Sequence, residues 1–419
     1  MSRPGVDVIS RALSPPLSPP TNTGVGFLVG LTPAGQTPAP PNVALVRSLT
    51  EYEATFGARG SVAGDQATYD SADAFFREGG SQLYVSRTNP GTVLDVEAAS
   101  ASLEPLKAGK AKISGGSVDT LALDPTIKAA LDALGKDLGP GQVWIADHTL
   151  AGDAANQSAL LAHAAATNRV ALLTTADGTA AALEAAAAAL ATDANARFGA
   201  LFAPSAIIPG VTAGTTRTVP YAAVEAGIIA RNDATFTANQ PAAGDLGQCV
   251  FVIDVEATYT DAEYTALNDA SVNMARVKYG GVRTYGYRTL DAQNANSQWV
   301  WFGNSRLNME ITAQAEAIGE HYVFTTLDGQ GKTIAQFGGD LSAMLNAFFL
   351  AGALYGATPQ DAFRVDVGSS VNTPTTIANG ELHAVLLVKM SPSPEWVVIE
   401  IVKVATTQTI APAGLSVAA

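Results

Sequence analysis

The chain has 419 residues, of which 47% are hydrophobic, with 39 glycines, 22 prolines and a formal net charge of −14. This length and composition indicate a folded protein with one or two sizeable cores and exclude a low-complexity chain. Nucleic-acid binding needs lysines and arginines gathered on one face to neutralise phosphates, and the sequence has no basic patch. We therefore expect a folded, acidic protein that does not bind nucleic acid.

The first twenty residues, MSRPGVDVISRALSPPLSPP, contain five prolines, which disfavour a helix. Val6, Val8 and Ile9 form a short extended segment that has no local strand to pair with. We therefore expect residues 1–22 to form an extended arm that adds to a sheet elsewhere. The segment lacks the apolar core of a signal peptide, and no apolar run reaches the length of about 20 residues that spans a bilayer. We expect a cytoplasmic product without membrane contact.

Residues 23–285 alternate short apolar runs with helix-period segments. The apolar runs predict strands at Val25–Val29, Leu83–Ser86, Val143–Ala146, Val170–Leu173, Phe198–Phe202 and Val250–Val255. The helical segments are Ser71–Glu78, Ala154–Ala166, Ala180–Ala191 and Ala222–Ala230. Such alternation predicts an α/β body with a mostly parallel sheet. Within it, we expect an irregular insertion at about 96–140 and polar loops at 211–219 and 233–247.

The pattern changes near residue 286. Two long helices are predicted at Ser305–Gly319 and Ala335–Leu354, with Gly356 ending the second. Strand-like runs follow at 363–367, 381–390 and 395–406. We predict an α+β C-terminal module over residues 286–405 that ends in antiparallel strands, followed by a loose tail over 406–419.

The segment TGVGFLVGLTPAG (23–35) resembles a nucleotide-binding turn, because Gly24, Gly26 and Gly30 punctuate an apolar strand. The dinucleotide fingerprint requires a helix N-terminus directly after the strand, where the pyrophosphate binds. Four prolines between residues 31 and 41 exclude that helix. We interpret Gly24 and Gly26 as close-packing positions at the entry of a buried strand, and Gly30 as the turn out of it.

The segment DGQGKT (328–333) ends like a phosphate-binding loop, and a strand-like run, His321–Thr325, precedes it. A phosphate-binding loop has a glycine five positions before its last glycine, and threonine stands there, at position 326. Without that glycine the backbone amides cannot curl around phosphates. We interpret the segment as the polar entry to a helix.

No pattern typical of catalysis is present. Asp254 and Glu256 are interpreted as solvated or structural carboxylates, and the single Cys249 as a buried, inert thiol. A zinc site is unsupported because the histidines lie far apart without HExxH spacing, and a hydrolase elbow of the form G-x-S-x-G is missing; the histidines are His148, His163, His321 and His383. We predict no catalytic, cofactor-binding or metal-binding residues, and therefore a protein that is not an enzyme.

Several segments, in the same order, resemble the sheath proteins of contractile phage tails, pyocin-like particles and other contractile injection systems. RPGVDVIS (3–10) is similar to the start of these sheaths, and two further stretches follow in order: PNVALVRSLTEYEATFG (41–57) and SADAFFREGGSQLYVSR (71–87). LNDASVNMARVKYGGVRTYGYRTL (267–290) also resembles the family, with Tyr287 where alanine is usual, and the family's helix follows as RLNMEI (306–311). The C-terminal module is matched by NAFFLAGALYGATPQDAFRVDVGSSVNTP (346–374) and GELHAVLLVKMSPSPEWVVIEI (380–401).

The resemblance implies a structural subunit that forms stacked hexameric rings in a helical array around an inner tube. Contraction of this array drives the tube through a target envelope. The implied partners are other sheath subunits, the inner tail tube protein, and the baseplate and tail terminator proteins. The implied location is a virion tail assembled in the host cytoplasm, or the cytoplasm itself for a bacterial injection system.

In this family the N- and C-terminal arms exchange strands with neighbouring subunits, and the C-terminal module faces the tube. On this sequence the expected strand-exchange positions are Val6, Val8, Ile9, Val397, Ile399, Ile401 and Val404. Two alternatives stay open. One is another viral structural protein, such as a baseplate or capsid component. The other is an α/β enzyme whose site is assembled from residues that show no recognisable pattern.

Overall fold

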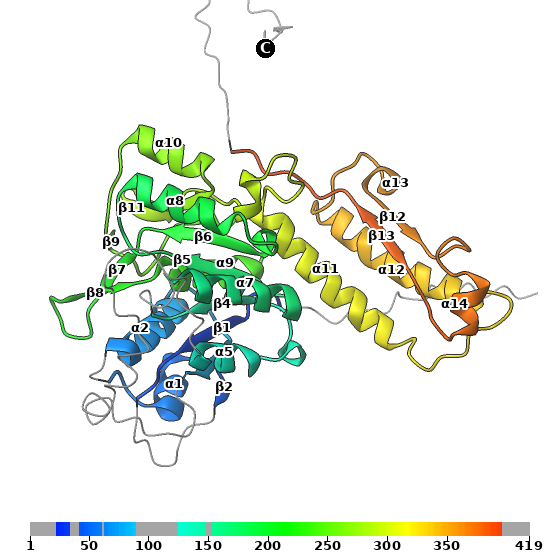
Figure 1. The fold of residues 1–419 in the computed structure, drawn as a ribbon, viewed down its shortest axis with the longest axis horizontal. Coiled ribbons are helices and arrows are strands. Elements are labelled where there is room, and N and C mark those ends of the chain that lie inside the picture. The colour runs from blue at the N-terminus through cyan, green and yellow to red at the C-terminus, as the bar shows by residue number, and fades with distance from the viewer. Residues whose placement is uncertain (1–21, 34–41, 61–62, 89–124, 148–152, 396–419) are drawn as a thin grey trace, which may run out of the picture.

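A computed structural model describes residues 22–33, 42–60, 63–88, 125–147 and 153–395. Its main feature is a sheet of eight strands in the spatial order β11 (Gly281–Thr284), β10 (Val272–Lys278), β6 (Gly199–Ala203), β5 (Val170–Thr174), β4 (Gln142–Ile145), β1 (Gly26–Gly30), β3 (Leu83–Arg87) and β2 (Val43–Val46) (Figure 1). The inner strands run parallel, and β2 and β11 pair antiparallel at the two edges. The predicted α/β body with a mostly parallel sheet is confirmed.

Helices cover both faces of this sheet (Figure 1). One face carries α9 (Tyr221–Asp233) and α2 (Ala63–Arg77), with α1 (Leu49–Phe56) beside α2. The other face carries α5 (Pro125–Asp132), α7 (Ala154–Thr167), α8 (Ala180–Leu190) and α10 (Asp261–Asp269). A second sheet joins β8 (Thr216–Val219), β7 (Ala206–Pro209) and β9 (Asp254–Val255), and 3-10 turns lie at η1 (Lys136–Leu138), η2 (Ala196–Phe198) and η3 (Leu290–Gln293).

The inner strands are apolar on both faces. Successive residues of a strand point to opposite sides of the sheet, so a strand covered on both sides reads as a continuous hydrophobic run. In β1, Leu28 belongs to the hydrophobic cluster on one face, whereas Phe27 and Val29 belong to the cluster on the other. In β4, Trp144 belongs to the same cluster as Leu28, and Val143 belongs to the cluster of Phe27 and Val29. This arrangement explains why short apolar runs marked these strands in the sequence.

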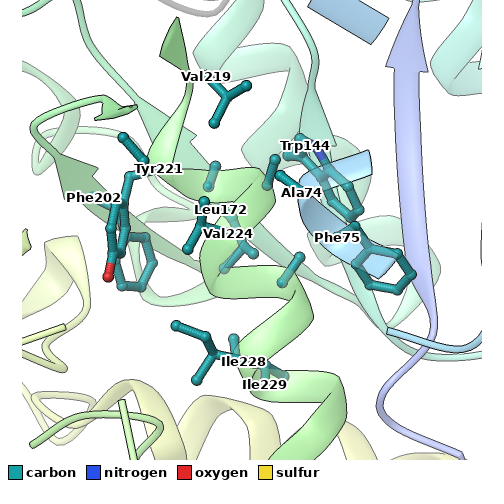
Figure 2. Close-up of a cluster of buried hydrophobic side chains, with 14 of the residues drawn as sticks. Ala74, Phe75, Trp144, Leu172, Phe202, Val219, Tyr221, Val224, Ile228 and Ile229 are labelled. Carbon is teal, nitrogen blue, oxygen red and sulfur yellow. The ribbon is translucent and has the colours of Figure 1, made fainter. Parts of the chain in front are cut away.

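The helix α9 is buried between α2 and the sheet. Figure 2 shows Val224 and Ile228 of α9 in the same cluster as Phe75 of α2 and Trp144 of β4. The two helices approach closely because Gly227 has no side chain; a Cβ atom there would lie 2.6 Å from the carbonyl oxygen of Phe75. The end of α9 also lies against the segment that enters β1, where the hydroxyl of Thr23 donates a hydrogen bond to Asp233.

The chain after residue 300 forms a region to one side of the sheet (Figure 1). Residues 302–395 of this region belong to the described part of the predicted C-terminal module, and below the name refers to these residues. The module contains α11 (Phe302–Glu320), α12 (Lys332–Leu350), α13 (Pro359–Ala362), β12 (Phe363–Asp366), α14 (Pro374–Ala378) and β13 (Val385–Val388). A separate hydrophobic cluster fills it. Two long helices and an antiparallel strand pair form the α+β arrangement that the sequence predicts. The domain boundaries at 22, 285 and 405 stay predictions.

Some local predictions were wrong. The predicted loop at 211–219 contains β8, where the β-branched residues of TRTV favour a strand that pairs with β7. The predicted strand at His321–Thr325 is a turn after α11. The second long helix begins earlier than predicted, at Lys332. It also ends earlier, at Leu350, because Gly352, with φ 79°, ends it in place of Gly356. The described part of the insertion expected at 96–140 contains the regular helix α5.

The strand predicted at Val250–Val255 is confined to its last two residues, β9. The fully buried carboxylate of Glu78 accepts hydrogen bonds of 2.8 to 3.3 Å from the backbone N–H groups of residues 250–252. Because these N–H groups bind a carboxylate, they are not free to join a sheet. The resulting loop leaves Val250 73% exposed and Ile253 55% exposed.

Candidate assembly site

The helix α11 passes from the α/β body into the C-terminal module. At its start, the ring of Phe302 lies with its centroid 5.2 Å from that of Tyr287 and 6.2 Å from that of Phe202, inside the body. Farther along, Leu307 and Ile311 belong to the hydrophobic cluster of the module. One continuous helix therefore connects the two cores.

A buried ion pair fixes the body end of α11. Arg306 is fully buried, pairs with Asp233 at the end of α9, and donates a hydrogen bond of 2.9 Å to the carbonyl oxygen of Ala238. Asp233 also accepts a hydrogen bond of 2.6 Å from the hydroxyl of Thr23, at the entry to β1. Three segments that lie far apart in the sequence thus meet at one carboxylate.

The sheet of the C-terminal module has only two strands among the described residues. β12 and β13 pair antiparallel, from Phe363 opposite Val388 to Asp366 opposite Val385. Within the part of the chain that the structure describes, no strand pairs with the other edge of either one. An unpaired apolar edge strand is a template for strand addition and is normally protected. The edge of β13 is therefore a candidate docking site for another strand.

An apolar groove lies beneath β13. It has a volume of ≈ 410 Å³ and is lined by α11, α12 and alternate residues of the β13 segment. Its lining is mostly apolar, with Asn308, Thr312 and Glu316 as the polar members; the apolar residues are Ile311, Ala315, Phe337, Leu341, Ala384, Leu386 and Val388. Because side chains alternate along a strand, Val385 and Leu387 point away from the groove, and they are 44% and 55% exposed. The groove and the free edge together can accept a strand with one apolar face.

The residues predicted to exchange strands lie outside the described residues, so their prediction is not tested. These are Val6, Val8, Ile9, Val397, Ile399, Ile401 and Val404. The structure instead describes the apolar groove. Sequence reasoning missed the groove because its lining comes from three segments; the alternation in ELHAVLLVKM (381–390) was the one visible signal.

The segment DGQGKT is the entry to α12, as predicted. The carboxylate of Asp328 accepts hydrogen bonds from the backbone N–H groups of Gln330, Lys332 and Thr333, at 2.8, 3.1 and 2.9 Å. The bonds from Thr333 and Lys332 lower the pKa of Asp328 to about 2. A helix N-terminus attracts an anion, and here the chain supplies its own carboxylate. In structure the segment is similar to a phosphate-binding loop in one respect, because several of its backbone N–H groups point at the carboxylate of Asp328.

The glycines of TGVGFLVG serve close packing. A Cβ atom on Gly24 would lie 3.0 Å from the Cα atom of Ala230, and one on Gly26 would lie 2.8 Å from the ring of Trp144. The packing interpretation of these two positions is confirmed. Gly30 is the last residue of β1 rather than a turn, and a Cβ atom there would lie 2.2 Å from the hydroxyl oxygen of Thr68 on α2.

The buried titratable groups of the body have structural partners. Nε2 of His163 lies 3.1 Å from a guanidinium nitrogen of Arg169, and burial together with this arginine lowers the pKa of His163 to about 4. Burial raises the pKa of the Cys249 thiol, which lies 3.2 Å from the hydroxyl of Tyr221. The described residues contain no group of three histidines, cysteines or carboxylates placed to hold a metal ion. Among the described helices, none has the length and apolarity needed to cross a membrane.

Comparison with solved structures defines the class of fold. The chain is similar to the helical sheath of the anti-feeding prophage in the contracted state, with a TM-score of 0.65 and 17% identity, covering 96% of this chain and 99% of that one. It is also similar to the contracted sheath complex of PVC, an extracellular contractile injection system, with a TM-score of 0.63 and 18% identity, covering 96% and 98% of the two chains.

A crystal structure of a sheath tail protein from Desulfitobacterium hafniense has a TM-score of 0.53 and 12% identity, and covers 87% of this chain and 93% of that one. Searches with the sequence found no matching family model and no matching curated protein. The expected likeness to sheath proteins is confirmed at the level of the fold. The chain has the fold of contractile sheath proteins across nearly its whole length.

Proposed function

We propose that the chain is a structural subunit of a contractile sheath. In this proposal, copies form hexameric rings that stack helically around an inner tube, and contraction drives the tube through a target envelope. The observation that carries the proposal is the sheath fold over 96% of the chain. The edge of β13, which has no strand partner among residues 22–33, 42–60, 63–88, 125–147 and 153–395, supports it together with the groove beneath, because a neighbouring copy could supply the missing strand.

The terminal segments of neighbouring copies are the proposed occupants of the site. Val397, Ile399 and Ile401 are two residues apart, so in an extended strand they lie on one face. Val6 and Val8 are spaced in the same way, with Ile9 beside them. Backbone hydrogen bonds to the free edge supply affinity, while the apolar side chains select the groove. Val404 extends the C-terminal segment.

The inner tube protein and the baseplate and tail terminator proteins complete the proposed set of partners. The C-terminal module faces the tube and the α/β body lies outside, in a phage tail or in a cytoplasmic injection system. The role is mechanical rather than enzymatic. The proposed energy source is the extended assembly itself, in which small interface gains on contraction add up over many subunits.

Electron microscopy of the purified chain tests the proposal. We expect hollow tubes or rings in negative stain at high protein concentration. Deleting residues 1–20 should prevent long assemblies and leave the circular dichroism and melting of the body unchanged, because the deletion removes only the donated segment. A chain that stays monomeric at high concentration would contradict the proposal, and an unfolded deletion variant would show that the segment completes its own subunit.

A baseplate component is the second candidate. Two similar structures are described as the anti-feeding prophage baseplate, with TM-scores of 0.64 and 0.66, and each covers 96% of this chain. The same micrographs separate the two functions. A sheath subunit propagates into tubes of many rings, whereas a baseplate component stops at a single ring.

A further inference from the structure

The chain that follows β13 returns to the α/β body. The backbone N–H of Ser391 donates a hydrogen bond of 3.0 Å to the carbonyl oxygen of Ala353, and its hydroxyl donates one of 2.8 Å to that of Gly352. Residues 392–395 then run back toward the body (Figure 1). Two prolines in this Pro-Ser-Pro-Glu stretch fix φ and favour an extended course. The stretch thus acts as a short, stiff spacer.

An ion pair with the body ends this return. Nε of Arg288 donates to the Glu395 carboxylate at 2.9 and 3.2 Å, and Nη2 donates at 2.5 Å. The side chains of the two residues are 18% and 19% exposed. This fork-to-carboxylate geometry is the strongest that a guanidinium forms, and its partial burial limits screening by solvent.

The body holds Arg288 through contacts other than the pair with Glu395. The side chain of Asn273, fully buried in β10, accepts from the Arg288 N–H at 2.7 Å and donates to its carbonyl oxygen at 2.8 Å. Nη1 of Arg288 donates to the carbonyl oxygen of Asn268 at 3.1 Å, and the Asp269 carboxylate lies 3.7 Å away. The backbone of Arg288 is therefore anchored to β10 of the main sheet, and its guanidinium to the end of α10, through bonds that do not involve Glu395.

We propose that Arg288 and Glu395 form a clamp that fixes the starting point and direction of the C-terminal segment that each subunit donates. This inference rests on the proposed strand exchange. Val397, Ile399 and Ile401 begin two residues after Glu395, so a fixed Glu395 restricts the region that they can reach. A segment that starts from a fixed point has a higher effective concentration at the neighbouring groove than one that starts free at Ser391. The clamp positions the donated strand and does not itself enter the groove.

Charge exchange across the pair tests the clamp in the full-length chain. Arg288→Glu and Glu395→Arg should each raise the protein concentration needed for assembly by about tenfold, equivalent to about 1.4 kcal/mol per subunit. The double variant, R288E with E395R, should return it close to the wild-type value. Lys128→Glu is the matched control, because it breaks an exposed pair with Asp132 on α5 and should leave assembly unchanged.

Hydrogen exchange in the unassembled chain measures the clamp separately from assembly. Each single variant should speed the exchange of the Ser391 amide, which donates to the carbonyl oxygen of Ala353, and the double variant should slow it again. Single variants with wild-type amide exchange and a wild-type assembly concentration would overturn the clamp. A double variant that does not restore the assembly concentration would overturn it as well. A wild-type chain that never assembles while the exchange pattern holds would contradict only the proposed function. If Arg288→Glu fails to fold, Glu395→Gln carries the same test, because Glu395 lies outside the sheets.

Discussion

The α/β body and the C-terminal module differ in how deeply they bury their apolar strands. In the body, β1, β5 and β6 are buried at every residue, and helices cover both faces of the sheet. In the module, every residue of β13 is partly or largely exposed, although its sequence VLLV is as apolar as the strands of the body. Equal hydrophobicity with unequal burial shows that the body completes its own core, whereas in the module an apolar strand stays partly exposed among the residues that the structure describes.

The largest expected effect concerns the helix that joins the two regions. Arg306→Met leaves Asp233 buried without its partner, which should cost about 3–5 kcal/mol in the free energy of unfolding, measured by urea denaturation. The matched control is Lys136→Ala, which breaks an exposed ion pair between η1 and Glu316 on α11 and should cost less than about 1 kcal/mol. Equal losses in the two variants would contradict a special role for the buried pair.

A pH-dependent effect is expected from His163, in the α/β body. The pKa of His163 is about 4 in the folded chain and near 6.5 when unfolded, so the unfolded chain binds more protons between these values. The free energy of unfolding is therefore not reduced by His163 above pH 6.5. It falls as the pH drops toward 4, by about 3 kcal/mol in total. His163→Gln keeps an acceptor for Arg169 and should lose less stability over this range. Parallel stability curves for the two proteins would rule the effect out.

Substitutions in β13 are expected to change stability least. One of them should nevertheless have a large effect on assembly. Leu386→Asn lines the groove with an amide and should cost about 1 kcal/mol of stability while preventing tube formation. Leu387→Asn on the opposite face should change stability by less than about 0.5 kcal/mol and leave tubes intact. Melting curves and negative-stain images of the pair give both readouts. Tubes from Leu386→Asn would show that the groove is not an assembly site.

The sequence predicts the main sheet well because the signal there is local. A strand such as Val170–Leu173 is apolar on both faces, so its position is visible within a few residues. The segment 250–255 misled the prediction because Glu78, 172 residues away from Val250, takes its backbone N–H groups. Tertiary hydrogen bonds of this kind leave no periodic pattern.

The candidate site was predictable only in part. The resemblance to sheath proteins identified the segments that carry Arg288 and Glu395, but nothing in the sequence paired residues that lie 107 positions apart. The groove likewise needs Ile311, Leu341 and Leu386 to meet from three different elements. Decoy motifs were easier to judge, because the prolines after β1 and the threonine at position 326 violate local geometric requirements.

The hydrogen bonds from residues 250–252 to Glu78 have a consequence for contacts with other molecules. Ordering a backbone costs about 1–2 kcal/mol of conformational entropy per residue. In this loop the entropy is lost when the chain folds, so a neighbour that meets Val250 and Ile253 does not have to order them. Association on this surface would be limited by desolvation and orientation rather than by loop ordering.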